Sequence, residues 1–201
     1  MAKNMMSKAA CPAKLIRDAA WVDAQLNIFV KEIISGAALD LIVIAGIRRR
    51  GAELARRVCE RARKASQIKI PYGALDITLY RDDVALRGPA LHTQKQGTVL
   101  DAPIDNRIVY LIDDVMYTGR TIRAAMTELT DYGRPGSIRL FSLIDRGGRE
   151  LPIQPDRVGE KLIVPAADRV EVRVKEVDGE EGVFVVVGGM RGFTISWAAA
   201  E

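Results

Sequence analysis

Two adjacent carboxylates, Asp113 and Asp114, directly follow an unbroken apolar run at residues 108–112. A short run rich in β-branched residues is typical of a strand buried on both faces of a parallel sheet. Paired carboxylates at the end of such a strand are costly to bury unless cations, hydroxyl donors or water meet them. They suit sugar hydroxyls or a hydrated Mg2+. We therefore expect both aspartates at the carboxyl edge of the sheet.

A turn rich in hydroxyls and backbone N–H groups follows the carboxylates at residues 117–121, and helical spacing resumes over residues 122–129. A helix N-terminus where Gly119 lets the backbone approach a ligand, flanked by Thr118 and Thr121, is a ready site for a phosphate. Carboxylates followed by a phosphate site predict the seat of a phosphorylated sugar. The alternative is an ordinary strand, turn and capped helix with two solvated aspartates.

Two further loops are expected at the same edge. A strand predicted at residues 39–45 leads into a loop at residues 46–51, whose consecutive arginines are suited to hold a pyrophosphate. A solvated basic turn is the alternative there. Another buried strand, predicted at residues 138–144, ends at residues 145–149. Ligands of doubly wound sheets collect outside the carboxyl ends of strands, so three converging ends predict a site.

The remaining pattern predicts the elements around this edge. We expect a helix with one apolar stripe over residues 15–34, a second helix ending near residue 63, a strand at residues 75–80, and a hairpin of residues 170–177 and 182–187 around Asp178 and Gly179. Between them, residues 81–98 form a long irregular segment. It holds the single histidine, His92, which we interpret as exposed and non-catalytic.

The composition indicates one globular domain of 201 residues with net charge +4 and a pI near 9.2, which favours anionic partners. Cys11 and Cys59 are too few for a metal site or a disulfide framework, and we expect reduced thiols. No long apolar stretch occurs, so we expect a soluble, cytoplasmic protein. We divide the chain into a tail at 1–12, a domain at 13–187 and an extension at 188–201.

The segment at residues 107–130 resembles the phosphoribosyl pyrophosphate (PRPP) signature of the type I phosphoribosyltransferases. Residues 46–51, 75–83 and 144–153 are similar to the pyrimidine operon regulators that double as uracil phosphoribosyltransferases. The resemblance covers roughly residues 14–187. It implies an α/β type I phosphoribosyltransferase fold, with a mostly parallel central sheet flanked by helices, a small hood and a C-terminal β-hairpin.

The resemblance also implies a reaction, in which uracil and PRPP give uridine monophosphate (UMP) and pyrophosphate with inversion at C1 of the sugar. It assigns catalytic roles to Asp113, Asp114 and Arg81, and a pyrimidine site to Arg146, Val158 and Gly159. Mg2+ would be bound through PRPP rather than by the protein alone. The PRPP site implied by the resemblance comprises Arg48, Arg49, Arg50, Gly51, Asp113, Asp114, Val115, Met116, Tyr117, Thr118, Gly119, Arg120 and Thr121.

Two regions carry further implications of the resemblance. The segment after Tyr80 and Arg81 corresponds to a flap that closes over the sugar and diphosphate, which excludes water from a cation-like transition state. In the arginine loop, the family has Lys and Thr where this chain has Arg48 and Arg49. Tighter pyrophosphate binding, an arginine rotated to solvent and a weakened site are all open outcomes. A homodimer or higher homo-oligomer is expected.

Two alternative functions remain open. One is an RNA-binding attenuation regulator, in which basic side chains contact the leader RNA of the pyrimidine operon. The candidates are Arg56, Arg57, Arg134, Arg139, Arg149, Arg157 and Lys161. RNA-active relatives carry histidines where this chain has Val30 or Phe29 and Gly148, which weakens this hypothesis. The other is transfer to a different base, such as a purine, because the PRPP signature reads only the sugar phosphate.

Overall fold

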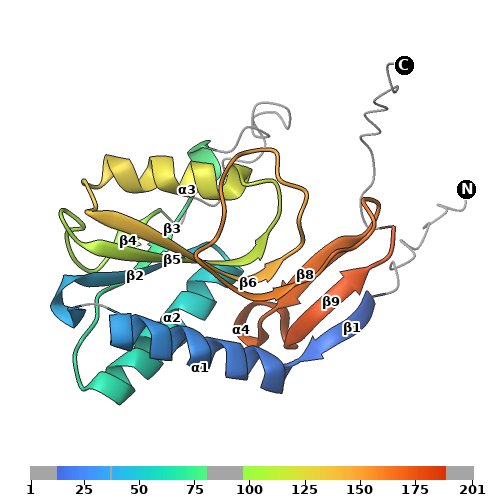
Figure 1. Cartoon of the computed structure of the whole chain (residues 1–201), viewed down its shortest axis with the longest axis horizontal. Helices are drawn as coiled ribbons and strands as arrows, with labels where there is room; N and C mark the ends of the chain where they lie inside the picture. Colours follow the sequence, from blue (N-terminus) through green and yellow to red (C-terminus); the bar gives the residue numbers. More distant parts are fainter. Residues whose placement is uncertain (1–12, 37, 81–96, 189–201) are drawn as a thin grey trace, which may run out of the picture.

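A six-stranded sheet forms the centre of the computed structural model, which describes residues 13–36, 38–80 and 97–188 (Figure 1). Its strand order is β4-β3-β2-β5-β6-β7, and every neighbouring pair is parallel except β3 with β4. The strands are β2 (Ile42–Ile47), β3 (Tyr72–Leu75), β4 (Val99–Leu100), β5 (Ile108–Met116), β6 (Ser137–Asp145) and β7 (Arg157–Lys161). The predicted α/β class with a mostly parallel sheet is confirmed.

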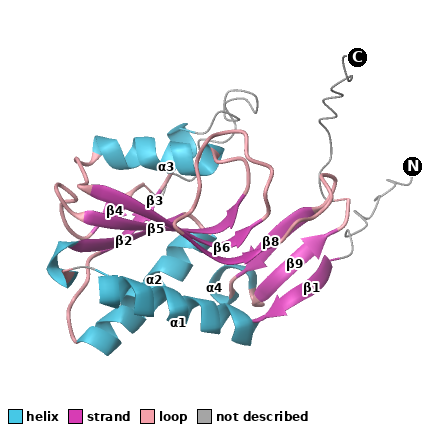
Figure 2. Ribbon diagram, viewed as in Figure 1, coloured by secondary structure: helices cyan, strands magenta, loops and turns pink. Residues whose placement is uncertain are grey.

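Helices cover both faces of this sheet: α1 (Ala19–Gly36) and α2 (Arg50–Ser66) lie on one side and α3 (Arg120–Asp131) on the other (Figures 1 and 2). Successive residues of a strand point to opposite faces. Accordingly, Ile42 and Ile44 pack in the core under α1 and α2, while Val43 and Ala45 pack in the core under α3. Burial on both faces explains why the central strands are continuous apolar runs.

A second, three-stranded antiparallel sheet, here called the small sheet, has the order β1-β9-β8. It combines β1 (Ala13–Asp18) with β8 (Arg169–Arg173) and β9 (Gly182–Val186), and the short helix α4 (Lys175–Asp178) joins β8 to β9. Val172 and Val183 are fully buried in the same core as α1 and α2. The small sheet is therefore anchored on the α1 and α2 side of the central sheet.

Four predicted boundaries are wrong. The strand expected to end at Asp113 and Asp114 continues as β5 to Met116, so both carboxylates lie within the strand rather than after it. The helix expected from residue 15 begins at Ala19, because the residues before it pair with β9 as β1. The strand expected from residue 39 begins at Ile42, after a 3-10 turn at Leu39–Leu41. The strand expected at residues 75–80 ends at Leu75. There the Asp76 carboxylate accepts hydrogen bonds from the N–H and hydroxyl of Thr78, which closes a turn.

The predicted hairpin needs one correction. β8 ends at Arg173, and residues 175–178 form α4 instead of continuing the strand. The Asp178 carboxylate accepts a hydrogen bond from the Val174 N–H at 2.9 Å, which closes this helical turn. Three strands, β1, β4 and β7, were not predicted as strands. Within the described residues, no helix combines the length and the apolarity that crossing a membrane requires.

Candidate active site

Three adjacent parallel strands, β2, β5 and β6, end at the same edge of the central sheet, as the sequence predicted. A cavity of about 360 Å³ lies there, here called the site cavity. Its walls come from the loop after β2, the end of β5, the start of α3 and the end of α4. It is lined by Ile47, Arg48, Arg49, Arg50, Gly51, Ile77, Asp113, Asp114, Val115, Thr121, Val177 and Asp178.

The two predicted carboxylates both face the site cavity from the end of β5. Asp113 is 4% exposed, and Asp114 is partly buried with Oδ1 accepting the Val115 N–H at 2.9 Å. Burial raises the pKa of the Asp114 carboxyl above its ordinary value, and the Arg50 guanidinium opposes this shift. The pair thus concentrates negative charge that a cation or hydroxyl donors would stabilise.

The arginine loop, residues 48–50, is held against β5 by two glycines. A Cβ on Gly46 would lie 2.2 Å from the Gly51 carbonyl oxygen, and one on Gly51 would lie 2.7 Å from the Ile112 carbonyl oxygen. Only residues without side chains permit such close backbone contact. The peptide bond between Arg48 and Arg49 is cis. All three arginines line the site cavity, as do the two aspartates.

Arg50 reaches across the site cavity to α4. Its Nε and Nη2 donate hydrogen bonds to the Asp178 carboxylate at 3.0 and 2.8 Å, a two-pronged ion pair. This contact lowers the pKa of Asp178 and raises that of Arg50. The small sheet, through α4, is thereby connected to the arginine loop.

The turn between β5 and α3 comprises residues 117–119 and includes the glycine that was expected to let the backbone approach a ligand. Gly119 is the N-cap of α3 at φ +94°, a conformation that side chains disfavour. Gly119 makes no side-chain capping hydrogen bond, and Thr118 Oγ1 accepts the Arg120 N–H at 3.3 Å. The positive end of α3 is suited to bind an anion. Thr121, in the first turn of α3, lines the site cavity.

Arg149, in the loop after β6, connects this turn to the neighbouring loop by hydrogen bonds. Its Nη1 donates to the Tyr117 carbonyl oxygen at 2.8 Å, its Nη2 to Asp145 at 2.8 Å and its Nε to the Ile153 carbonyl oxygen at 3.0 Å. The N–H groups of Glu150 and Leu151 both donate to the Thr118 carbonyl oxygen. The carbonyl side of the turn is therefore fixed by the neighbouring loop.

Arg146, predicted to border the pyrimidine, is 7% exposed and stacks on the Tyr117 ring, with its guanidinium carbon 4.0 Å from the ring centroid. Its Nε is buried and has no hydrogen-bond partner among the described residues. Gly148 flanks the same ring: at φ +71°, a Cβ there would lie 2.4 Å from Tyr117 Cε2. The ring is thus enclosed by Arg146 and by backbone.

Comparison with known proteins connects this geometry to a family. Residues 23–176 match the family described as the phosphoribosyl transferase domain. The chain is 50% identical to the bifunctional protein PyrR of Roseiflexus sp. over 72% of this chain and 79% of that protein. It is 42% identical to PyrR of Herpetosiphon aurantiacus over 88% and 97% of the two chains. This chain belongs to the PyrR family of type I phosphoribosyltransferases.

Solved structures of more distant phosphoribosyltransferases share the PyrR fold seen here. Hypoxanthine phosphoribosyltransferase of Staphylococcus aureus superposes with a TM-score of 0.58 at 16% identity, covering 87% of this chain and 92% of that one. The Trypanosoma cruzi enzyme gives 0.58 at 16% identity, covering 87% and 96%. At this identity the likeness concerns the fold alone. The predicted family, fold and enzyme class are confirmed.

The other predicted site residues that the structure describes lie outside the site cavity of this PyrR family member. Met116 is buried in the core under α3. Arg120 is exposed and pairs with Glu150 at 2.7 Å. Val158 and Gly159 lie in β7, at the edge of the central sheet rather than in the small sheet, and Gly159 packs against α1 near Trp21. Arg81, predicted to be catalytic, and His92, predicted to be non-catalytic, are outside the described residues.

Four residues line the site cavity that the sequence did not single out: Ile47, Ile77, Val177 and Asp178. The first two are buried core residues: Ile47 ends β2, and Ile77 lies in the turn after β3. Val177 and Asp178 were expected in a hairpin, where nothing connected them to the aspartates some 65 residues earlier. The contact of α4 with the start of α2, through Asp178 and Arg50, brings them to the site cavity, and no local sequence pattern indicates it.

Proposed function

We propose that this protein is a uracil phosphoribosyltransferase that converts uracil and PRPP to UMP and pyrophosphate. The observation that carries the proposal is the site cavity, in which paired carboxylates face three arginines beside the start of α3. These are the groups that a ribose with a phosphate at each end requires. Family membership and the PRPP signature at residues 107–130 support the same assignment.

In this mechanism the bond from C1 of the sugar to the diphosphate oxygen breaks, N1 of uracil bonds to C1 with inversion, and the N1 proton passes to solvent. The arginine loop would hold the leaving diphosphate. Asp113 and Asp114 would hold the ribose hydroxyls and favour positive charge on the sugar. The turn at residues 117–119 and Thr121 would bind the 5'-phosphate, which does not react but fixes the geometry.

Mg2+ fits this site as part of the substrate complex. The described residues contain no group of three or more His, Cys, Asp or Glu side chains placed to bind a metal. The carboxylates of Asp113 and Asp114 are the hard oxygen ligands that Mg2+ prefers, and would bind it together with oxygens of PRPP. When bound, the ion supplies positive charge that neutralises the departing diphosphate. Arg81, which is not among the described residues, is proposed to help neutralise the departing diphosphate.

The base is proposed from family membership together with Arg146, whose buried Nε could donate to a pyrimidine carbonyl or to the ribose. Val158 and Gly159 are kept as proposed base contacts. Initial rates with uracil, hypoxanthine, guanine and orotate, each with PRPP and Mg2+, test the assignment. Uracil is expected to be the preferred substrate by about 100-fold or more, since a site built for one set of hydrogen bonds rejects mismatched bases. Faster turnover of any other base contradicts it.

Binding of pyrimidine operon leader RNA is a second candidate, favoured by the bifunctional name of the curated relatives. The basic side chains proposed for it are mostly engaged: five pair with carboxylates, namely Arg56, Arg57, Arg139, Arg149 and Arg157. RNA would have to compete with these contacts. A gel shift with leader RNA at low salt, with and without UMP, tests this function. Absence of a UMP-dependent shift would exclude it. The homo-oligomer and the cytoplasmic location remain proposals.

A further inference from the structure

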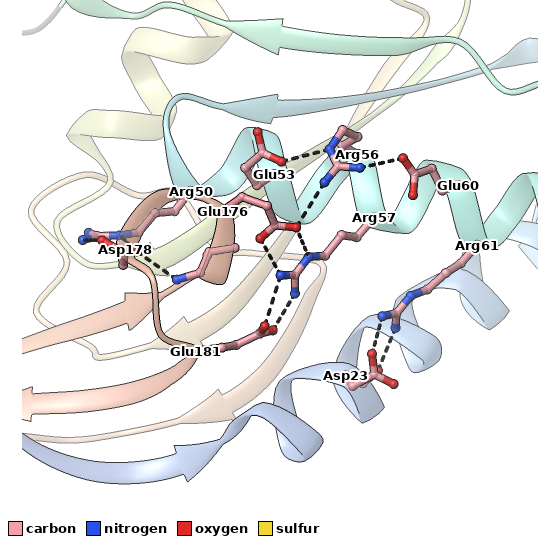
Figure 3. A network of polar contacts seen from close by, with 11 residues as sticks. Asp23, Arg50, Glu53, Arg56, Arg57, Glu60, Arg61, Glu176, Asp178 and Glu181 are labelled. Carbon is pink, nitrogen blue, oxygen red and sulfur yellow. Dashed lines mark hydrogen bonds and ion pairs between the residues drawn. The ribbon is translucent and has the colours of Figure 1, made fainter.

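The segment between β8 and β9 presents a row of carboxylates to one side of α2 (Figure 3). Arg57 binds Glu176 at 2.6 Å and Glu181 at 2.5 Å, and Arg50 binds Asp178 at 2.8 Å. Arg50 and Arg57 are seven residues apart, so both lie on the same face of the helix. These ion pairs connect the small sheet to the helix that begins at the arginine loop.

The pair of Arg50 with Asp178 differs from the others because both residues line the site cavity. Arg57, Glu176 and Glu181 do not line it. Asp178 is also held by its own helical turn, since its Oδ2 accepts the Val174 N–H at 2.9 Å. The carboxylate then accepts both Nε and Nη2 of Arg50, a geometry that sets the plane of the guanidinium as well as its position.

Arg50 is held in this way next to the paired aspartates. Its charge lowers the pKa of Asp114 against the opposing effect of burial. An arginine side chain near a site is otherwise free to adopt many rotamers, and fixing it before the substrate arrives reduces the entropy lost on binding. Asp178 therefore contributes to the cavity by orienting the guanidinium of Arg50.

We propose that Asp178 is a positioning residue, which orients Arg50 beside Asp114 for the diphosphate of PRPP without touching the substrate. This inference rests on the proposed function. It assigns to α4 a role in diphosphate binding, although the sequence separates α4 from the PRPP signature. A competing possibility is that Asp178 occupies Arg50 and must be displaced by the diphosphate, and the experiment below distinguishes the two.

The test compares Asp178→Asn with the matched control Glu181→Gln, which removes a carboxylate from the same segment without changing a cavity residue. PRPP binding with Mg2+ is measured by calorimetry, and KM and kcat by UMP synthesis. Asp178→Asn is expected to raise the Kd and KM for PRPP about tenfold, the loss typical of one charge-assisted contact, with the KM for uracil changed less than about twofold. Glu181→Gln is expected to leave both KM values near the wild type.

Further variants separate positioning from a general structural effect. In an Arg50→Gln background, Asp178→Asn is expected to have no additional effect on PRPP, because it acts only through Arg50. Arg50→Lys, which keeps the charge but loses the two-pronged contact, is expected to reproduce the tenfold loss. The proposal is overturned if Asp178→Asn leaves PRPP binding unchanged, tightens it, or still weakens it in the Arg50→Gln background.

Measurements on the wild type distinguish failure of the proposed function from failure of the proposed role of Asp178. Absence of both PRPP binding and UMP synthesis in the wild type would remove the proposed function together with the role of Asp178. If the wild type binds PRPP and forms UMP while Asp178→Asn matches it, only the role of Asp178 fails. Thermal unfolding of each variant confirms that it is folded, and Arg50→Lys supplies the decisive comparison should Asp178→Asn not fold.

Discussion

Gly51 packs against Asp113: a Cβ on the glycine would lie 3.4 Å from the Asp113 Oδ1 and 3.3 Å from its Cα. The start of α2 and the end of β5 are therefore in backbone contact. The distance between the arginine loop and the paired carboxylates depends on this contact, because no side chain intervenes. The arginine wall and the carboxylate wall of the site cavity are thus set by one close approach.

Replacing Gly51 with alanine is expected to push the arginine loop away from β5. The cost is about 1–3 kcal/mol in the free energy of unfolding, as for an overpacked core, together with weaker PRPP binding. Denaturant unfolding and calorimetry measure the two effects. Gly36→Ala is the control, since a Cβ there meets only the Tyr110 hydroxyl at 3.7 Å. Equal stability of the two variants would contradict the expectation.

The double substitution Asp113→Asn and Asp114→Asn is expected to abolish most turnover, by about 100-fold or more, while the fold survives. Asparagine preserves shape but removes the negative charge that favours a positively charged sugar. Steady-state UMP synthesis and circular dichroism provide the measurements. Turnover near the wild-type rate in a folded double variant would show that these carboxylates are not the catalytic groups.

Arg149→Gln is expected to weaken UMP binding about tenfold, because the turn at residues 117–119 loses a charge-assisted contact behind its Tyr117 carbonyl. Pyrophosphate binds at the arginine loop in our proposal, so its affinity is expected to change little. Arg139→Gln is the control, as Arg139 pairs with Asp156 on the surface. Calorimetry with each ligand tests this, and a parallel loss of both affinities would indicate a general structural defect instead.

The pH dependence of stability is expected to report Asp114. Its pKa in the folded state is raised by burial above the ordinary value of 3.8. A carboxyl with a raised pKa contributes stability that is fully present below pH 3.8 and is lost as pH rises through the folded pKa. The wild type should therefore lose stability relative to Asp114→Asn over this range. Parallel curves of unfolding free energy against pH would refute the assignment.

Much of the site could be predicted because it is encoded locally. The apolar run before Asp113, the glycine at 119 and the arginines at 48–50 each specify a strand end, a turn or a loop within a few residues. Parallel strands then bring the ends of β2, β5 and β6 to one edge, so local patterns suffice to place these residues together.

The remainder depends on long-range pairing that no local pattern records. The residues of β1 have the spacing of a helix, yet they pair with β9 from the far end of the chain. Asp178 is in a predicted turn, and its contact with Arg50 spans 128 positions. The sequence also did not predict β7, where the missing Cβ of Gly159 allows the strand to approach the Leu143 carbonyl oxygen. Tertiary contacts decided each case.

The order β1-β9-β8 has a consequence for assembly of the chain during synthesis. β9 is the central strand of the small sheet and the last strand in the described residues, so β1 and β8 have no partner until it has emerged from the ribosome. The central sheet from β2 to β7 is complete before that point. Nascent chains halted before residue 182 should accordingly present a formed PRPP-signature edge with its α4 wall still undocked.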